Sequence, residues 1–356
     1  MAETAKFSSP WGRTGLGLAL GAVGGWLATQ VGLPLPWMLG AMIATTIAAI
    51  AGAPIALPGS LRAVMIAVLG VMLGSGFSPE ILERLADWAL SLSTLGLYIA
   101  VAGGFSYLYF RRFAGFDRPT AYFSAMPGGF SEMVIAGGAM GGDPRLIALV
   151  HASRLLLVIM LLPIGLRAAL GVEAVSRPPA GDPLAGFVAA DLAILAACGL
   201  LGYALARLLR LPAAAIVGPM AMSAAAHLGG VTEASPPFLL VALAQVVVGT
   251  GVGVRFANTK PALVFRTALV GVGATLILVL GTIAFALGLD ALADLPVSAL
   301  VLAFAPGGVA EMSLIALALG ADAAFVATHH IVRIFMIVLI APTVFRGLDR
   351  HATVSR

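Results

Sequence analysis

Long apolar blocks are the feature of this sequence that most limits its fold. They run for roughly 17–25 residues, the length that a helix needs to cross about 30 Å of hydrocarbon. Hydrophobic residues fill 60% of the 356 positions and charged residues only 10%. An average soluble domain is about 45–50% apolar and about 25% charged, so a soluble fold would lack surface charge. The sequence therefore predicts an all-α polytopic membrane protein.

A repeated motif divides the chain into two halves. The segment "PGGFSEM" at 127–133 recurs as "PGGVAEM" at 306–312, and the offset 306 − 127 = 179 continues without a gap through an Asp, a His, an Arg and a Pro. The earlier parts of the halves align less strongly, pairing Gly24 with Gly202 and Gly40 with Gly218. We expect membrane repeat 1 over residues 1–172, a polar linker over 173–184, membrane repeat 2 over 185–350 and a cytoplasmic tail over 351–356.

The basic residues predict that the two repeats are inverted. Each repeat offers six apolar blocks, near 12–31, 34–52, 61–77, 87–110, 120–140 and 145–169, then 185–208, 212–230, 236–255, 263–289, 297–319 and 323–345. Lys and Arg gather on the cytoplasmic side of membrane proteins. If the fifth block of each repeat enters and leaves on one side, both termini are cytoplasmic. If all the blocks cross, five basic residues move outside: Arg207, Arg210, Arg255, Lys260 and Arg266.

The Pro-Gly-Gly segment is the natural candidate for the block that does not cross. Proline and paired glycines break a helix, and broken backbone is tolerated at membrane depth only where protein or a water-filled cavity receives its polar groups. A different block could be the non-crossing one. We expect two inverted repeats with about ten transmembrane helices plus two broken or re-entrant segments, a plan that recurs in secondary transporters.

Glu132 and Glu311 follow these breaks by three positions. Carboxylates within a membrane are costly and are candidates for function by default, so one or both could bind a proton, a cation or a cationic substrate. Each could instead cap the helix that restarts after Pro-Gly-Gly. The freed backbone N–H groups could also hold an anion, so the sign of the substrate stays open.

Two His–Arg pairs lie three residues apart, His151 with Arg154 and His330 with Arg333, which puts each pair on one helix face. They could form an anion clamp with a titratable histidine, or a structural pair that locks the break to a neighbouring helix. Each arginine needs a carboxylate or a backbone carbonyl as partner. His329 has no counterpart in repeat 1 and is interpreted as incidental.

The predicted substrate or ion site therefore draws on both repeats, with Pro127, Gly128, Gly129, Glu132, His151 and Arg154 from the first and Pro306, Gly307, Gly308, Glu311, His330 and Arg333 from the second. Asp143 and Asp322 begin the last block of each repeat and are more typical of helix N-caps than of ligands. The glycines of "GSG" and "GTG", at 74–76 and 249–251, favour close helix packing.

The chain shows no P-loop, nucleophile elbow, HExxH or dinucleotide fingerprint. We therefore expect no enzymatic activity, catalytic residue, cofactor or metal, and no direct contact with nucleic acid.

At the PGG repeats, the HxxR pairs and "LPLPWMLGAM", the sequence resembles the AbrB-type family of bacterial membrane proteins. These carry an internal duplication and are often labelled "ammonia monooxygenase" or "transcriptional regulator". The resemblance covers nearly the whole chain, and it implies residence in the inner membrane and involvement in regulating gene expression.

The leading hypothesis is a secondary transporter of a small polar solute, with its site between the two PGG elements. The alternative is a membrane-embedded sensor or regulator that acts on gene expression through a partner protein. The expected partners are the lipid bilayer, a small polar solute, a possible second copy of the chain and a possible regulatory protein.

Overall fold

A computed structural model describes residues 9–79, 81, 86–171, 189–293 and 295–354. All the regular secondary structure within these ranges is helical. The predicted linker over 173–184 lies outside the described residues, as do the last two residues of the predicted tail.

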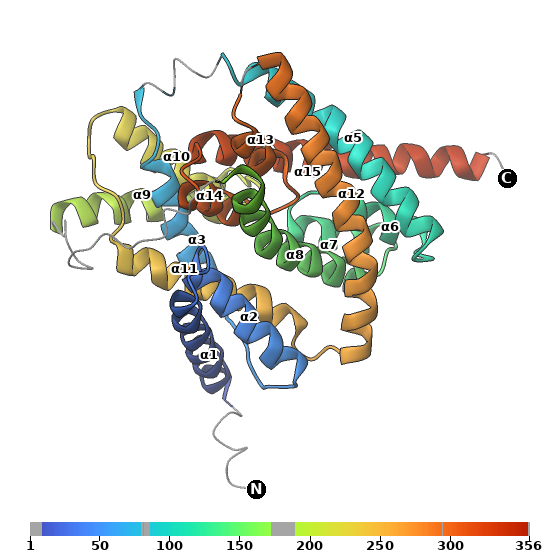
Figure 1. The fold of residues 1–356 in the computed structure, drawn as a ribbon, viewed down its shortest axis with the longest axis horizontal. Helices are drawn as coiled ribbons and strands as arrows, with labels where there is room; N and C mark the ends of the chain where they lie inside the picture. The colour runs from blue at the N-terminus through green and yellow to red at the C-terminus, as the bar shows by residue number, and fades with distance from the viewer. Residues whose placement is uncertain (1–8, 80, 82–85, 172–188, 294, 355–356) are drawn as a thin grey trace, which may run out of the picture. The chain divides into compact units, whose positions relative to one another are not determined.

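Helices form at the predicted apolar blocks, and the fifth block of each repeat forms two helices (Figure 1). The first three blocks of each repeat become α1 (Pro10–Gln30), α2 (Pro36–Ile50), α3 (Gly59–Gly74), α9 (Ala189–Leu208), α10 (Ala214–Leu228) and α11 (Phe238–Gly253), the last followed by a 3₁₀ turn at Val254–Phe256. The remaining blocks become α5 (Ala89–Arg112), α6 (Arg118–Ala125), α7 (Phe130–Ala139), α8 (Pro144–Leu170), α12 (Pro261–Ala293), α13 (Val297–Phe304), α14 (Val309–Ala318) and α15 (Ala323–Val354).

The helices have the length and composition of membrane spans. Six of those described are long and apolar enough to cross a bilayer: α5, α8, α9, α11 extended to Phe256, α12 and α15. The shorter helices α2, α3, α10 and α14 are also apolar. The chain is an all-α polytopic membrane protein, as its sequence predicts.

The described residues form two compact units, and each unit draws on both repeats. Unit 1 takes its residues from 1–84, 159–264 and 313–324, and therefore contains α1 to α3 together with α9 to α11. Unit 2 takes its residues from 85–158, 265–312 and 325–356, and contains α5 to α7, most of α8 and α12, α13, the first turn of α14 and nearly all of α15. The repeats defined by sequence are therefore not the packing units.

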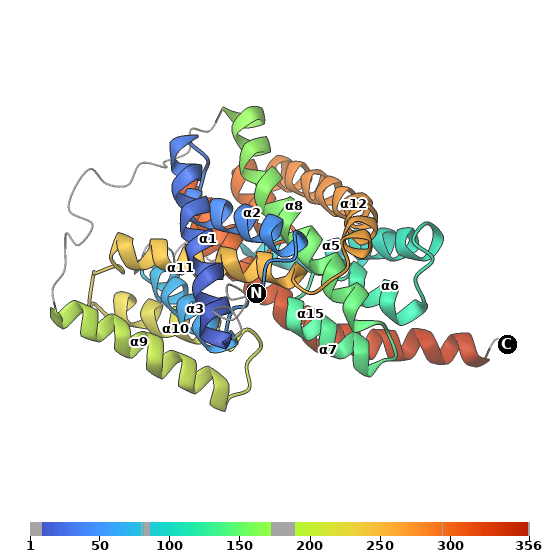
Figure 2. The same ribbon diagram turned by 90° about the horizontal axis from the view of Figure 1, so that it is seen from below.

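Glycines bring the helices of unit 1 into backbone contact. A Cβ at Gly24 of α1 would overlap the carbonyl of Gly40 in α2, and a Cβ at Gly202 of α9 would overlap that of Gly218 in α10. Figure 2 shows α1 beside α2 and α9 beside α10. Small residues allow helices to approach this closely in a membrane, so the aligned glycines of the two repeats serve the same packing.

The glycines of the "GSG" and "GTG" segments also lie at close helix contacts. Gly74 of α3 lies against the backbone of Met220, and Gly249 of α11 against the backbone of Met38. Neither position leaves space for a larger side chain.

Unit 2 is built around aromatic and long aliphatic side chains. Tyr122, Phe123 and Met126 of the α6 segment pack with Ile337 and Phe345 of α15 in one buried cluster. This cluster holds the end of α6, and hence the first Pro-Gly-Gly segment, against the last long helix of the chain.

Candidate functional site

Both Pro-Gly-Gly segments interrupt a helix in unit 2. In repeat 1, α6 ends at Ala125 and α7 begins at Phe130; in repeat 2, α13 ends at Phe304 and α14 begins at Val309. The four helix limits keep one offset, since 297 − 118, 304 − 125, 309 − 130 and 318 − 139 all equal 179. Met126 and Gly129 have extended backbone, with ψ of 127° and 136°.

An interrupted helix leaves backbone groups without intrahelical partners. The last carbonyls of α6 and α13 and the first N–H groups of α7 and α14 lose their helical hydrogen bonds. In a membrane protein such groups need internal partners, because hydrocarbon supplies none. The predicted His, Arg and Glu residues are the side chains that surround these two breaks.

Each His–Arg pair binds the carbonyl end of its own break. His151 of α8 donates from Nε2 to Phe123 O at 2.9 Å, and Arg154 donates to Met126 O at 3.1 Å. His330 of α15 donates in the same way to Leu302 O at 2.9 Å, and Arg333 donates to Ala305 O at 2.6 Å. These carbonyls also correspond at the offset of 179, so the two repeats use one arrangement.

The hydrogen bond within each pair fixes the histidine tautomer. Arg154 donates from Nη2 to His151 Nδ1 at 2.8 Å, and Arg333 donates to His330 Nδ1 at 2.9 Å. A guanidinium has only donors, so Nδ1 must accept and the ring proton resides on Nε2. Both imidazoles are therefore neutral in this arrangement.

The arginines take carbonyl oxygens, not carboxylates, as partners. Arg333 additionally contacts Phe304 O at 3.3 Å and Gly307 O at 2.8 Å, and no ion pair joins either arginine to a described carboxylate. Both side chains are buried, with 4% of Arg154 and 1% of Arg333 exposed. The positive charge lies at the carbonyl end of a helix, where the helix dipole favours a cation.

The two glutamates fold back over the second glycine of their motif. Glu132 and Glu311 are the third residues of α7 and α14, and a Cβ at Gly129 or Gly308 would overlap the carboxylate of the glutamate that follows. Both carboxylates belong to the first turn of a helix, where the helix dipole favours a negative charge. Glu311 is buried, with 6% of its surface exposed, whereas Glu132 is half-buried.

Tyr98 and Thr282 join the site from α5 and α12. The Tyr98 hydroxyl lies 3.1 Å from Thr282 Oγ1, and Thr282 Oγ1 lies 3.4 Å from Phe304 O at the second break. Tyr98 and Thr282 therefore join the second break within unit 2.

Sequence reasoning missed Tyr98 and Thr282. Each lies in a long apolar block that also contains other hydroxyl side chains, which is a weak signal because such a hydroxyl can bond to its own helix. Thr282 does so at Leu278 O, 2.9 Å away. Their position beside the second break appears only in three dimensions.

The two aspartates lie at helix starts. Asp143 directly precedes α8, and its carboxylate accepts hydrogen bonds from the backbone N–H groups of Arg145 at 2.8 Å and Leu146 at 3.2 Å. Asp322 directly precedes α15. The Asp143 contacts are those of an N-cap.

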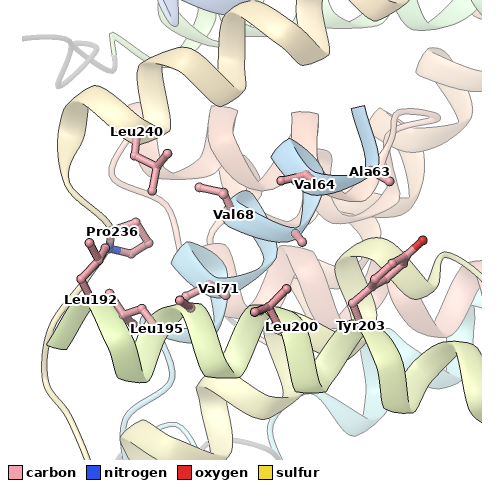
Figure 3. A pocket seen from close by; sticks show the side chains of 13 residues that line it. Ala63, Val64, Val68, Val71, Leu192, Leu195, Leu200, Tyr203, Pro236 and Leu240 are labelled. Atoms are coloured by element: carbon pink, nitrogen blue, oxygen red, sulfur yellow. The ribbon is translucent and has the colours of Figure 1, made fainter. Parts of the chain in front are cut away.

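Unit 1 contains an apolar cavity of its own (Figure 3). It has a volume of about 290 Å³ and lies between α3, α9 and the start of α11. Figure 3 shows Val64, Val68 and Val71 of α3 facing Leu195 and Leu200 of α9. Its lining offers almost no polar atoms, so it cannot recognise a polar solute.

Comparisons with known proteins agree with the sequence pattern. The model of a family described as AbrB, transition state regulatory protein, matches residues 37–349, a range that includes both breaks and both His–Arg pairs. The chain is 27% identical over 357 residues to "Uncharacterized protein YhjN" of Bacillus subtilis (strain 168), covering 93% of this chain and 92% of that protein. It is 28% identical over 334 residues to "Putative regulator AbrB" of Escherichia coli (strain K12), covering 92% of this chain and 93% of that protein. The chain belongs to the AbrB family.

Proposed function

We propose that this chain is a secondary transporter of a small polar solute in the bacterial inner membrane. The observation that carries the proposal is the pair of interrupted helices in unit 2, whose limits match at one offset and whose carbonyl ends are bound by matching His–Arg pairs. Interrupted helices from two repeats form the binding sites of many secondary transporters. The solute would bind beside the two breaks, and alternating access would move one part of the protein against the other.

The chemistry of the breaks supports a polar solute. Two glutamates, two buried arginines and a tyrosine hydroxyl surround them, and the Nε atoms of both arginines have no protein hydrogen-bond partner among the described residues. Buried polar atoms without a partner are costly. A polar solute or water would supply the missing acceptors.

Uptake into proteoliposomes tests the proposal. Purified protein would be screened with small organic anions, amino acids and ammonium, with and without a pH gradient. We expect uptake that Glu132→Gln and Glu311→Gln reduce, in protein that still inserts and melts as the wild type does. Arg207→Ala, at an exposed position near the end of α9, is the matched control and should transport normally. If folded wild-type protein moves none of these solutes, the transporter proposal fails.

Membrane topology is a second test of the same proposal. We infer inverted repeats with both termini in the cytoplasm from the distribution of basic residues. Reporter fusions after α5, after α12 and at the C-terminus would locate these sites. If all the blocks crossed instead, the end of α12 would be cytoplasmic, so a cytoplasmic reporter after α12 would contradict the inverted arrangement.

The second candidate is a membrane-embedded sensor that regulates gene expression through a partner protein. It is favoured by the family description and by the name of the Escherichia coli relative, both of which refer to regulation. A deletion strain complemented with wild type or with a variant that binds but does not transport would separate the two. A transcriptional effect that survives loss of transport would favour the sensor. We propose no enzymatic activity for this chain.

A further inference from the structure

His329 is a buried titratable side chain that the proposed site does not use. It lies on α15 directly before His330, and the aligned position in repeat 1 is Val150, since 329 − 179 = 150. None of its surface is exposed. Its Nδ1 lies 2.8 Å from Phe325 O and its Nε2 lies 2.8 Å from Ser91 Oγ.

These partners differ in kind from those of the two neighbouring histidines. At His151 and His330 an arginine donates to Nδ1, so a second ring proton would place two donors face to face. At His329 the Phe325 carbonyl can only accept, which keeps a proton on Nδ1. Nε2 faces a hydroxyl, which can either donate or accept.

Ser91 can therefore form a hydrogen bond with Nε2 of His329 in either protonation state. Its Oγ lies 2.9 Å from Trp88 O as well as 2.8 Å from His329 Nε2. When the imidazole is neutral, the serine hydroxyl donates to Nε2. When it is protonated, Nε2–H donates to Ser91 Oγ and the hydroxyl turns to Trp88 O. Only a hydroxyl rotation separates the two states: the bond between Ser91 and His329 is present in both, and the bond from Ser91 to Trp88 O is made in the protonated state.

Aromatic rings surround the imidazole. The ring centroids of Phe325, Phe304 and Trp88 lie 4.0 Å, 6.1 Å and 6.5 Å from that of His329. A buried charge needs compensation, and an aromatic face as near as that of Phe325 attracts a cation. The surroundings thus offer hydrogen-bond acceptors and aromatic rings to an imidazolium.

Few ionisable groups share these elements. On α15 the nearest are His330 and Arg333, and α5 has Asp87 just before it and Tyr98 two turns beyond Ser91. The helix that carries Phe304, α13, has no ionisable side chain. Arg333 lies one helical turn from His329 and holds the carbonyls of the second break, so a charge gained at His329 acts on the residue that holds that break.

We propose that His329, with Ser91, is a proton-binding site that couples proton movement to rearrangement of the second break. The coupling rests on the proposed transport function, whereas proton binding itself does not depend on it. The proton adds to His329 Nε2, and the site needs no cofactor or metal.

The protonation state can be measured directly. Protein with ¹⁵N-labelled histidine, reconstituted in lipid nanodiscs, would be titrated by NMR between about pH 5 and 8. We expect His329 to gain a second ring proton as the pH falls, while His151 and His330 keep one tautomer. Comparison with His329→Asn assigns the signal; if that variant does not fold, asparagine substitutions of the other four histidines, one at a time, assign it by elimination. A His329 that stays neutral throughout would overturn the proposal.

Ser91→Ala tests the hydroxyl without removing the titrating group. In this variant Nε2–H loses its acceptor in the protonated state, so the His329 midpoint should shift, whereas the His227 signal, from unit 1, should match that of the wild type. An unchanged midpoint would mean that Ser91 takes no part in proton binding, contrary to the proposal.

Coupling is measured separately, with a pH-sensitive dye trapped in proteoliposomes. Small organic anions, amino acids and ammonium would be added in turn, and the proton movement recorded. We expect solute-driven proton movement in the wild type and in His227→Asn, and none in His329→Asn. Equal movement in His329→Asn would refute coupling. If the wild type moves no solute, the transport function fails, and the NMR titration still decides proton binding.

Discussion

The two interrupted helices are copies of one motif, but the structure holds them unequally. Arg154 reaches a single carbonyl of the first break, whereas Arg333 reaches three carbonyls of the second. The second break also has an internal hydrogen bond from Gly307 N to Ala305 O at 2.8 Å. The two copies therefore keep the same arrangement, but the second break is held by more hydrogen bonds. We expect the first break to rearrange more readily.

The glutamates follow the same division. Glu311 is buried, and Glu132 is half-buried. Phe130 packs edge-on against His151 at 6.3 Å between ring centroids, and the equivalent residue in repeat 2 is the smaller Val309. The contact between the Phe130 and His151 rings thus stabilises the first break, whereas the second break has more hydrogen bonds.

Removing the arginines should give the largest difference between the breaks. Arg333→Ala should lower the free energy of unfolding by about 3–5 kcal/mol, because three buried carbonyls lose a charged donor. Arg154→Ala should lower it by about 1–3 kcal/mol. Unfolding of both variants in one detergent or bicelle system measures the difference. Equal losses would show that the extra contacts of Arg333 contribute nothing.

Replacing the second glycine of each motif with alanine should affect stability differently at the two breaks. Neither Gly129 nor Gly308 has a positive φ, so alanine fits the backbone and reduces the entropy of the unfolded chain. At Gly308 the methyl group displaces the buried Glu311 carboxylate, and we expect a loss of about 1–2 kcal/mol. At Gly129 the half-buried Glu132 can turn aside, and we expect a change near zero. Melting temperatures test this, and a larger loss at Gly129 would contradict it.

Glutamine substitution separates charge from capping. Glutamine can still fill the position of a capping glutamate, so Glu132→Gln and Glu311→Gln should change stability by less than about 0.5 kcal/mol. If the charge takes part in transport, uptake should fall about tenfold, equivalent to 1.4 kcal/mol. Unchanged uptake in either variant would assign that glutamate to capping alone.

A last test makes the two breaks more alike. Phe130→Val gives the first break the residue of the second and should cost about 0.5–1.5 kcal/mol, the value of an aromatic pair. Ile135→Val, at an exposed position of α7, is the control. A loss above about 2 kcal/mol would mean that Phe130 holds the first break by more than its contact with His151.

The sequence predicted the helices because their signals are local. Apolar length set the blocks, and proline with paired glycine located both breaks; α6 ends two residues before Pro127. The residues around each break were also found, because one offset relates the copies. Their partners were not, since only the fold shows that the arginines bind carbonyls and that Tyr98 and Thr282 join them.

His329 shows the limit of arguing from the repeat. It lacks a counterpart in repeat 1, and the repeat pattern therefore gave it no role. The structure buries it between α5 and α13 with a hydrogen-bond partner at each ring nitrogen. A residue that breaks an internal symmetry is as informative as one that follows it, but only its surroundings show why.

Each packing unit contains helices from both repeats, and this affects when the protein can fold during its synthesis. Because α3 packs on α10 and α2 packs on α11, a nascent chain that has released only its first half has completed neither unit. The faces of α2 and α3 that contact α11 and α10 stay uncovered until the second half of the chain has been translated. Assembly is therefore a late event in biosynthesis, and a stop codon near the middle would leave inserted helices for quality-control proteases to remove.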